Sequence, residues 1–229
     1  RGPDVRLSSP FQPAAGVIEA QLGSHRVLGS PRAPDVLKQV HDPNVIMVVW
    51  LRDPNPALVQ ALASLDLPRE IRAPLHRLDA SRQIACLLAA AGADTQGLSA
   101  WIQDLAGLAT RFADLVDRLP APHPITLRIE TLSDDGCRRF HVDRSRLRLL
   151  CTYRGPGTEW LSEEQVDRAA LYSHFPNERI LKQGRPRRLE PFWVAIMKGE
   201  CYPGGVGQVH RSPEIAGTGV SRVLFCLDA

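Results

Sequence analysis

The chain has 229 residues, of which 44% are hydrophobic and 23% are charged, and its formal net charge at pH 7 is +3. A chain of this length can bury a full core in one large domain or two small ones, and its composition excludes a fibrous or disordered protein. The net charge gives no indication of nucleic-acid binding, and no run of about 18 apolar residues predicts a membrane span.

The N-terminal sequence and the cysteines indicate where the protein resides. The N-terminus has neither an apolar h-region nor a cleavage site, so we expect a cytoplasmic protein. Five cysteines without CxxC spacing fit reduced thiols better than a disulfide framework. We expect small core side chains and not metal ligands at all five positions, which are Cys86, Cys137, Cys151, Cys201 and Cys226.

The first part of the chain predicts an arm, one strand and a helix. Residues 1 to about 44 are rich in Pro, Gly and Ser and predict an irregular arm. The β-prone run at residues 46–51 is stopped by Asp53 and Pro54 and predicts one early strand. Residues 56–65 have helical spacing and begin with a proline, which suits the first turn of a helix.

Helical patterns dominate the next 40 residues. An alanine-rich apolar stretch covers residues 80–91, and residues 99–119 give the clearest helix because apolar side chains recur at steps of one, three or four. Pro120 ends this helix. We expect its apolar stripe to pack against a sheet, and we predict that residues 1–123 form a mostly helical covering region.

Residues 124–229 predict β-structure, because short β-prone runs separated by turn residues replace the helical periodicity. Residues 125–132 alternate apolar with polar side chains, residues 133–136 have turn chemistry, and residues 137–142 are extended, which together predict a hairpin. Several short strands at this spacing indicate a sandwich or barrel. The further predicted strands are 147–153, 192–197, 208–211 and 222–227.

Three side chains in this region could hold a metal. His141 and Asp143 are two residues apart at the end of a predicted strand, so both side chains lie on one face and could meet one ion. His210 opens another predicted strand 69 positions later (210 minus 141). Two imidazoles and one carboxylate form the facial triad of non-haem Fe(II) oxygenases, which leaves coordination positions open. A single His-x-Asp arises often by chance, so the surrounding residues matter.

An arginine completes the pattern. Arg222 begins the last predicted strand, 12 positions after His210 (222 minus 210). A guanidinium inside a barrel needs an anion, and its planar fork matches a carboxylate best. The distal end of 2-oxoglutarate offers such a carboxylate.

Several motifs follow in the order of a known superfamily. After His-x-Asp come an Arg-led strand and a Gly-rich turn with an acidic residue, then a Lys-Gly turn, a second His with a prolyl segment, glycines, and an arginine opening a final apolar strand. These motifs occupy residues 146–160, 198–200, 210–213, 217–219 and 221–227. Over residues 125–229 the chain thus resembles the 2-oxoglutarate and Fe(II)-dependent dioxygenase superfamily, especially its prolyl-hydroxylase-like branch. Residues 141–144 and 154–161 also look like a bacterial family labelled only as a domain of unknown function.

The resemblance implies a fold and a site. The fold would be α+β, with a C-terminal double-stranded β-helix, a jelly-roll or cupin-like barrel, packed against N-terminal helices. Carried over by position, His141, Asp143 and His210 would bind the metal, and Arg222 would bind the distal carboxylate of 2-oxoglutarate, assisted by Tyr153 or Thr152. The cofactors would be Fe(II) and 2-oxoglutarate, and the reaction the hydroxylation of a small molecule or protein side chain.

Two other interpretations stay open. Some branches of the superfamily use a hydroxyl two positions after the arginine, and here Leu224 stands in that place. The same three ligands also suit redox-silent Zn(II), so the chain could be a non-catalytic zinc-binding or metal-homeostasis interaction protein on the same barrel. A third interpretation is a barrel with helical cover in which the His-Asp-His pattern is accidental.

The remaining polar candidates are expected to be structural. Residues 162–191 look like an inserted segment that could cover the barrel mouth, and His174 within it is expected to be an ordinary loop residue. The arginines at 185, 187 and 188 predict a solvated loop more than an anion clamp. Glu159 is expected in a turn and not as a fourth ligand, and Asp134 and Asp135 serve the hairpin turn. Phosphate-loop, dinucleotide-binding, serine-hydrolase and zinc-protease motifs do not occur.

Overall fold

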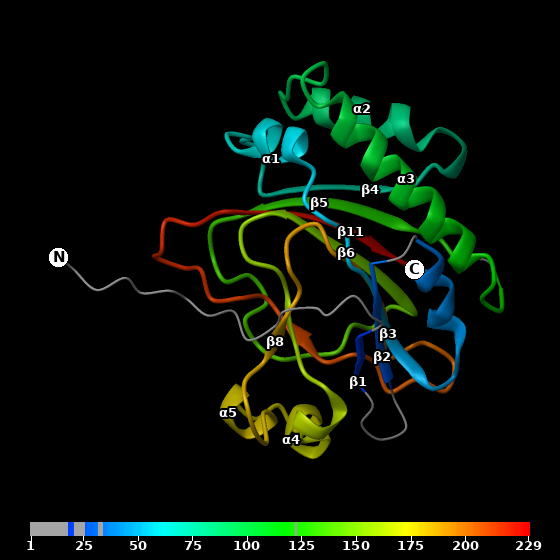
Figure 1. Cartoon of the computed structure of the whole chain (residues 1–229), viewed down its shortest axis with the longest axis vertical. Coiled ribbons are helices and arrows are strands. Elements are labelled where there is room, and N and C mark those ends of the chain that lie inside the picture. The colour runs from blue at the N-terminus through cyan, green and yellow to red at the C-terminus, as the bar shows by residue number, and fades with distance from the viewer. Residues whose placement is uncertain (1–17, 21–25, 32–33, 122) are drawn as a thin grey trace.

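The computed structural model describes residues 18–20, 26–31, 34–121 and 123–229, and helices cover a large sheet on one side (Figure 1). Among these residues, eight strands form one sheet in the order β1-β2-β3-β9-β6-β11-β5-β4, and three form a second sheet in the order β10-β7-β8. The β2–β3 pair is parallel and the other pairs are antiparallel. The chain is therefore a mixed α+β protein with a large, mainly antiparallel sheet.

The strands have the following bounds. The large sheet contains β1 (Ile18–Ala20), β2 (Arg26–Ser30), β3 (Val45–Trp50), β4 (Glu70–Pro74), β5 (Thr126–Leu132), β6 (Leu147–Arg154), β9 (Val194–Lys198) and β11 (Arg222–Asp228). The small sheet contains β7 (Glu159–Trp160), β8 (Arg187–Arg188) and β10 (His210–Arg211).

Three helices lie along one face of the large sheet (Figure 1): α1 (Pro56–Leu62), α2 (Ala80–Ala90) and α3 (Ser99–Val116). On α3, Trp101, Leu105 and Phe112 recur at helical spacing and are fully buried. They share a core with Leu127 of β5 and Phe225 of β11. The predicted apolar stripe therefore does pack on a sheet. Short 3-10 helices lie at Pro34–His41, Arg77–Asp79 and Glu163–Gln165.

A second core joins the two sheets. Leu150 of β6, Met197 of β9 and Leu224 of β11 are buried together with Trp160 of β7. Because side chains alternate along a strand, β6 and β11 give one face to the helices and the other to the small sheet. The inner face of the large sheet is therefore the one that can carry a site between the sheets.

A third core lies on the other side of the small sheet. It joins Phe140, Leu161 and Val209 to residues of α4 (Arg168–Tyr172) and α5 (Asn177–Ile180). Figure 1 shows these two short helices on the side of the molecule opposite to α2 and α3. The segments that carry His141 and His210 therefore have packed helices behind them.

Most of the predicted elements are confirmed. The helical patterns at 56–65, 80–91 and 99–119 correspond to α1, α2 and α3, and the predicted strands at 46–51, 125–132, 147–153, 192–197, 208–211 and 222–227 correspond to β3, β5, β6, β9, β10 and β11.

The predicted hairpin between residues 125–132 and 137–142 is wrong. The β5 strand pairs with β4 and with β11, and the 137–142 segment makes an isolated bridge through His141 to His210. The turn residues serve distant segments, because Asp134 pairs with Arg69 and Asp135 accepts hydrogen bonds from the backbone of residues 215 and 216. The turn residues 133–136 therefore do not pair the segment before them with the segment after them.

The expectation of an irregular arm and one early strand is also wrong. Before residue 124 the described residues form β1, β2, β3 and β4, and all four join the large sheet. The β2 strand and the 3-10 helix Pro34–His41 fall inside the expected arm, where Val27 and Leu37 are buried. The rest of that expectation, at residues 1–17, 21–25 and 32–33, lies outside the described residues.

The cysteine prediction is confirmed at two positions and wrong at three. Cys151 and Cys226 are buried, whereas Cys86, Cys137 and Cys201 are exposed. On α2 the buried face is formed by residues such as Ile84 and Leu88, so Cys86 lies off that face. Within the described part of the chain, no helix is both long enough and apolar enough to cross a membrane.

The helix-side core predicts a large stability effect. We expect Phe112→Ala to lower the free energy of unfolding by about 3–5 kcal/mol, because it leaves a cavity under α3. Leu78→Ala is the control, since Leu78 is fully exposed and should change stability by less than about 0.5 kcal/mol. Urea denaturation with matched m-values measures both, and equal effects would contradict this description of the core.

Candidate metal centre

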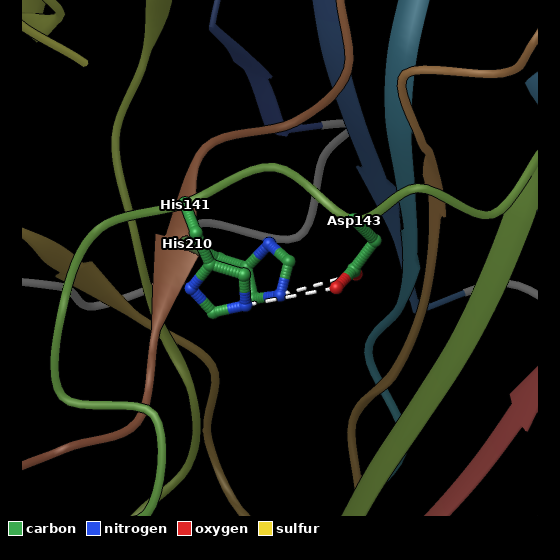
Figure 2. A group of neighbouring side chains, drawn as sticks. All are labelled: His141, Asp143 and His210. Atoms are coloured by element: carbon green, nitrogen blue, oxygen red, sulfur yellow. Dashed lines mark ion pairs between the residues drawn. The ribbon is translucent and has the colours of Figure 1, made fainter. Parts of the chain in front are cut away.

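A backbone bridge brings two distant histidines together. The N–H of His141 donates to the carbonyl of His210 at 3.0 Å, and the N–H of His210 donates to the carbonyl of His141 at 3.0 Å. Directly opposite residues in such a pair point to the same face, and the two ring centroids are 4.5 Å apart. The bridge therefore places both imidazoles side by side (Figure 2).

Asp143 completes the group. One carboxylate oxygen, Oδ2, lies 3.2 Å from Nε2 of His210, and the other, Oδ1, lies 3.6 Å from Nε2 of His141. Figure 2 shows both imidazoles directed at this carboxylate. One ligand atom from each residue lies within 4.8 Å of the others. The three side chains that the sequence singled out as metal ligands therefore converge.

The other nitrogen of each ring is held by a backbone carbonyl. Nδ1 of His141 lies 2.8 Å from the carbonyl oxygen of Arg139, and Nδ1 of His210 lies 3.1 Å from that of Gln208. A carbonyl only accepts, so each Nδ1 carries a proton, and a neutral ring then has its lone pair on Nε2. This hydrogen bond is the one that metal-binding histidines make in proteins, and both Nε2 atoms face Asp143.

The carboxylate of Asp143 is held in its charged form. Burial opposes ionisation, but with no metal bound a protonated His210, a hydrogen bond from protonated His141 and the guanidinium of Arg148 outweigh it and keep the pKa of Asp143 far below its usual range. Arg148 donates a hydrogen bond from Nη1 to Oδ1. The site thus offers one negative charge and two nitrogen lone pairs to a cation.

The spacing of these atoms fits a divalent ion. Two neighbouring ligands, each about 2.1 Å from a metal, lie about 3 Å apart, close to the 3.2 and 3.6 Å between Asp143 and the two histidines. Two imidazoles and a carboxylate are suitable donors for Fe(II) and for Zn(II). The residues present therefore fit a metal, although their donor set alone does not select between these two ions.

Arg222 is fully buried at the start of β11. Its Nε donates to the carbonyl of Pro156 at 2.7 Å and its Nη2 donates to Oγ1 of Thr158 at 3.3 Å. Its Nη1 has no hydrogen-bond partner among the described residues. Burial lowers the pKa of Arg222 to about 10, partly offset by Glu130. A buried guanidinium with a free N–H group is costly unless an anion fills the place.

A cleft of about 490 Å³ lies next to the two histidines and next to Thr158, a hydrogen-bond partner of Arg222. His141 and His210 line it, and so does Thr158, the residue whose hydroxyl accepts from Arg222. The other lining residues come mainly from the inner face of the large sheet and the loop before His141; they are Arg69, Glu70, Arg72, Arg128, Glu130, Leu132, Gly136, Cys137, Arg148, Leu150, Arg211, Ser212 and Leu224. The histidines and the surroundings of Arg222 therefore share one opening.

The role predicted for Tyr153 in cosubstrate binding is wrong. Its hydroxyl donates to Asp104 of α3 at 2.5 Å, and its ring packs edge-on against Trp101 and Phe192. These residues belong to the core on the helix side of the large sheet. Tyr153 alternates with Thr152 along β6, so Thr152 is on the inner side with Leu150. The assisting role of buried Thr152 stays a prediction.

The expectation that residues 162–191 cover the mouth is not met, because none of them lines the cleft. Instead, the amide of Asn177 on α5 holds the segment before His141: its Oδ1 accepts from the N–H of Phe140 at 2.9 Å, and its Nδ2 donates to the carbonyl of Arg138 at 3.0 Å. Sequence reasoning missed Asn177, and no local pattern indicates its role.

Arg168 holds the segment before the second histidine, His210, in a similar way. From α4 it donates to the carbonyls of Val206 and Gly207, each at 3.0 Å, and it also pairs with Glu163. Gly207 has a positive φ of 71°, and a Cβ there would lie 2.0 Å from Cγ1 of Val142. Only glycine allows the two histidine-bearing segments to approach so closely. The inserted segment thus supports the histidines from behind.

The expectations for the other polar residues are met at some positions and not at others. Glu159 is not in a turn: it lies in β7, buried, and pairs with Arg188 at 2.6 Å and Arg211 at 2.8 Å. The solvated loop expected at the arginines 185, 187 and 188 is confirmed at exposed Arg185, whereas Arg187 and Arg188 form the short strand β8, in which Arg188 is exposed. His174 is an exposed turn residue, as expected. None of these joins the His-Asp-His group.

Comparison with known proteins gives a family match. A family model described as "Protein of unknown function (DUF1826)" matches residues 31–228. This match confirms the expected resemblance to a family labelled as a domain of unknown function. No curated protein matches the chain.

Several solved structures are similar at low identity. A prolyl-4-hydroxylase from Pseudomonas putida has 12% identity and a TM-score of 0.36, covering 77% of this chain and 94% of its own. A full-length protein from Neurospora crassa in complex with alpha-KG has 12% identity and a TM-score of 0.40, covering 80% and 75%. An oxidoreductase of the 2OG-Fe(II) oxygenase family from Burkholderia pseudomallei has 15% identity and a TM-score of 0.39, covering 85% and 88%.

The convergence of three ligands predicts metal-dependent stability. We expect Zn(II) at 100 times its dissociation constant to stabilise the wild-type protein by about 2.7 kcal/mol, and Asp143→Ala to abolish this gain because it removes the charged ligand. His174→Asn removes an exposed imidazole and should keep the gain. Thermal denaturation with and without metal measures it, and an equal gain in Asp143→Ala would make the triad accidental.

The amide of Asn177 yields a second prediction. Asn177→Ala leaves the Phe140 N–H and the Arg138 carbonyl without their partner, so we expect a loss of about 1–2 kcal/mol of stability and a roughly tenfold weaker metal affinity. Asn44→Ala, on an exposed residue, is the control. Isothermal titration with Zn(II) measures the affinity, and unchanged binding would show that the segment does not depend on α5.

Proposed function

The chain belongs to the DUF1826 family of proteins of unknown function, and we propose that it is a non-haem Fe(II)- and 2-oxoglutarate-dependent oxygenase. The proposal rests on two features next to a cleft that is lined by His141, His210 and Thr158, the last of which accepts a hydrogen bond from Arg222. These are a His-Asp-His group that fits a divalent metal and a buried arginine with an unsatisfied N–H group. Together they match what an iron and a dicarboxylate cosubstrate need.

The proposed fold is a double-stranded β-helix. Within the large sheet, β5, β11, β6 and β9 are neighbours, and within the small sheet the His141 segment, β10, β7 and β8 follow one another. Two groups of four antiparallel segments with an apolar core between them are the arrangement of a jelly roll. In such a barrel the ligands of a metal would lie on the inner faces, and the fact that His141 and His210 line the cleft supports the proposal.

The residues would have distinct roles. His141, Asp143 and His210 would hold Fe(II), which together with 2-oxoglutarate supplies the activation of oxygen for hydroxylation of a C–H bond. Arg222 would bind the distal carboxylate, using the N–H group that lacks a partner. The carbonyls of Arg139 and Gln208 orient the imidazoles, and the cleft would admit the substrate, a small molecule or a protein side chain.

The buried Arg222 is the observation that carries the proposal. A protein that only stores or senses a metal has no need of an anion site beside it. Keeping a guanidinium fully buried without a carboxylate contact lowers stability, and proteins retain such costs mainly at functional sites. The hydroxyl of Thr158 would take the place of the hydroxyl that position 224 lacks, and its position 3.3 Å from Nη2 of Arg222 supports this.

The second candidate function is non-catalytic zinc binding or a role in metal homeostasis. The ligand set favours it as much as it favours iron, because two imidazoles and a carboxylate form stable zinc sites. It differs from the first proposal in one respect: it gives Arg222 no role.

The test is an anaerobic titration of the apo-protein with Fe(II) and then 2-oxoglutarate, followed by visible absorbance. We expect a charge-transfer band that requires both additions in the wild type. Arg222→Met should still bind metal but weaken 2-oxoglutarate binding by about 30-fold or more, since a charge contact is lost. Asp143→Ala should lose both.

The matched control is Arg72→Met, which removes an exposed arginine of the same cleft. It should bind Fe(II) and 2-oxoglutarate as the wild type does. If the wild type binds metal without any response to 2-oxoglutarate, the oxygenase proposal fails and zinc binding becomes the better explanation.

A further inference from the structure

Arg148 contacts the metal-ligand candidate Asp143 from the neighbouring strand. It lies on β6, five residues after Asp143, and its side chain is 18% exposed. Its Nη1 donates to Oδ1 of Asp143, and its Nε donates to Oδ1 of Asp228 at 2.5 Å. One guanidinium therefore spans a buried and a partly buried carboxylate.

Asp228 is itself fixed by a second arginine. Arg128 of β5 donates to Oδ2 of Asp228 from Nη2 at 2.9 Å and from Nε at 3.2 Å, and its Nη1 donates to Glu130 at 2.9 Å. The strand register sets this order, because Asp228 of β11 lies directly opposite Arg148. We name Glu130, Arg128, Asp228, Arg148 and Asp143 the charge chain.

The side chains of the charge chain are held rigidly and have little contact with solvent. Its members are 8–19% exposed, so each lost contact would leave a poorly hydrated charge. A planar guanidinium with both of its sides engaged has little freedom left. The contact with Asp228 therefore fixes the orientation in which Arg148 contacts Asp143.

The contact of Arg148 divides the two oxygens of Asp143. Arg148 donates to Oδ1, which lies 3.6 Å from Nε2 of His141, whereas Oδ2 lies closer to a histidine, at 3.2 Å from Nε2 of His210, and accepts no hydrogen bond from Arg148. A carboxylate that binds a metal through both oxygens occupies two coordination positions, and one that uses a single oxygen occupies one. Three ligand positions from the protein leave three for cosubstrate and oxygen in a six-coordinate site.

We propose that Arg148, anchored by Asp228, is a positioning residue that restricts Asp143 to one oxygen towards the metal. The inference rests on the metal site of the proposed function and adds a residue to it. Without Arg148, Oδ1 would be free to turn to the metal and occupy a position that the cosubstrate needs.

The test uses Co(II), whose visible spectrum reports coordination number and ligand type. The variants are Arg148→Met, Arg148→Lys and Asp228→Asn, with Arg72→Met as the control from the same cleft. We expect Arg148→Met to change the Co(II) spectrum and to weaken Co(II) binding by about 10- to 100-fold. Arg148→Lys should be intermediate, because lysine brings one charge without the fork, and Asp228→Asn should shift the spectrum in the same direction.

Each outcome decides a separate point. A wild-type protein that does not bind Co(II) would overturn the proposed metal site itself. A wild-type protein that binds Co(II), with an unchanged spectrum and affinity in Arg148→Met, would overturn only the role of Arg148. Should Arg148→Met not fold, unchanged spectra in both Arg148→Lys and Asp228→Asn would overturn it equally. Any change shared by Arg72→Met would also count against it.

Discussion

The antiparallel bridge between His141 and His210 is the contact on which the candidate site depends. Its two hydrogen bonds join segments 69 positions apart (210 minus 141) and direct both imidazoles to one side. Asp143 follows on the same side because it is two residues from His141. Such a short bridge would not hold this geometry alone. The helices α4 and α5 pack behind the two segments, and the amide of Asn177 and the guanidinium of Arg168 hold their backbones.

The inner face of the large sheet carries arginines that balance buried negative charge. A buried carboxylate such as Asp143 needs opposite charge nearby, and Arg148 supplies it while being held by Asp228. Arg222 lies on the same face without such a partner at Nη1 among the described residues. Two arginines of one sheet face thus differ: the guanidinium of Arg148 is paired with carboxylates of the protein, and that of Arg222 keeps one N–H group without a partner among the described residues.

The errors of prediction share a cause. Turn residues at 133–136 predicted a hairpin, but β5 finds its partners in β4 and β11 and the turn aspartates bind segments far along the chain. Residues 162–191 were expected at the mouth because they look like an inserted segment, yet four of their apolar side chains are buried in the core behind the small sheet, those of Val166, Ala170, Leu171 and Ile180. In each case the local pattern correctly separated polar from apolar residues. It did not indicate which distant segment those residues would contact.

The sequence by itself determined the helix at 99–119, most of the strands, and the His-x-Asp pair, because periods of 3.6 and 2 are local properties of the chain. It also singled out His210 and Arg222 as partners of that pair. Only the tertiary structure decided that Tyr153 faces the helices, that Arg148 joins Asp143 to Asp228, and that Asn177 supports His141. Strand register and packing bring these residues together over long sequence separations, and no local periodicity encodes such contacts.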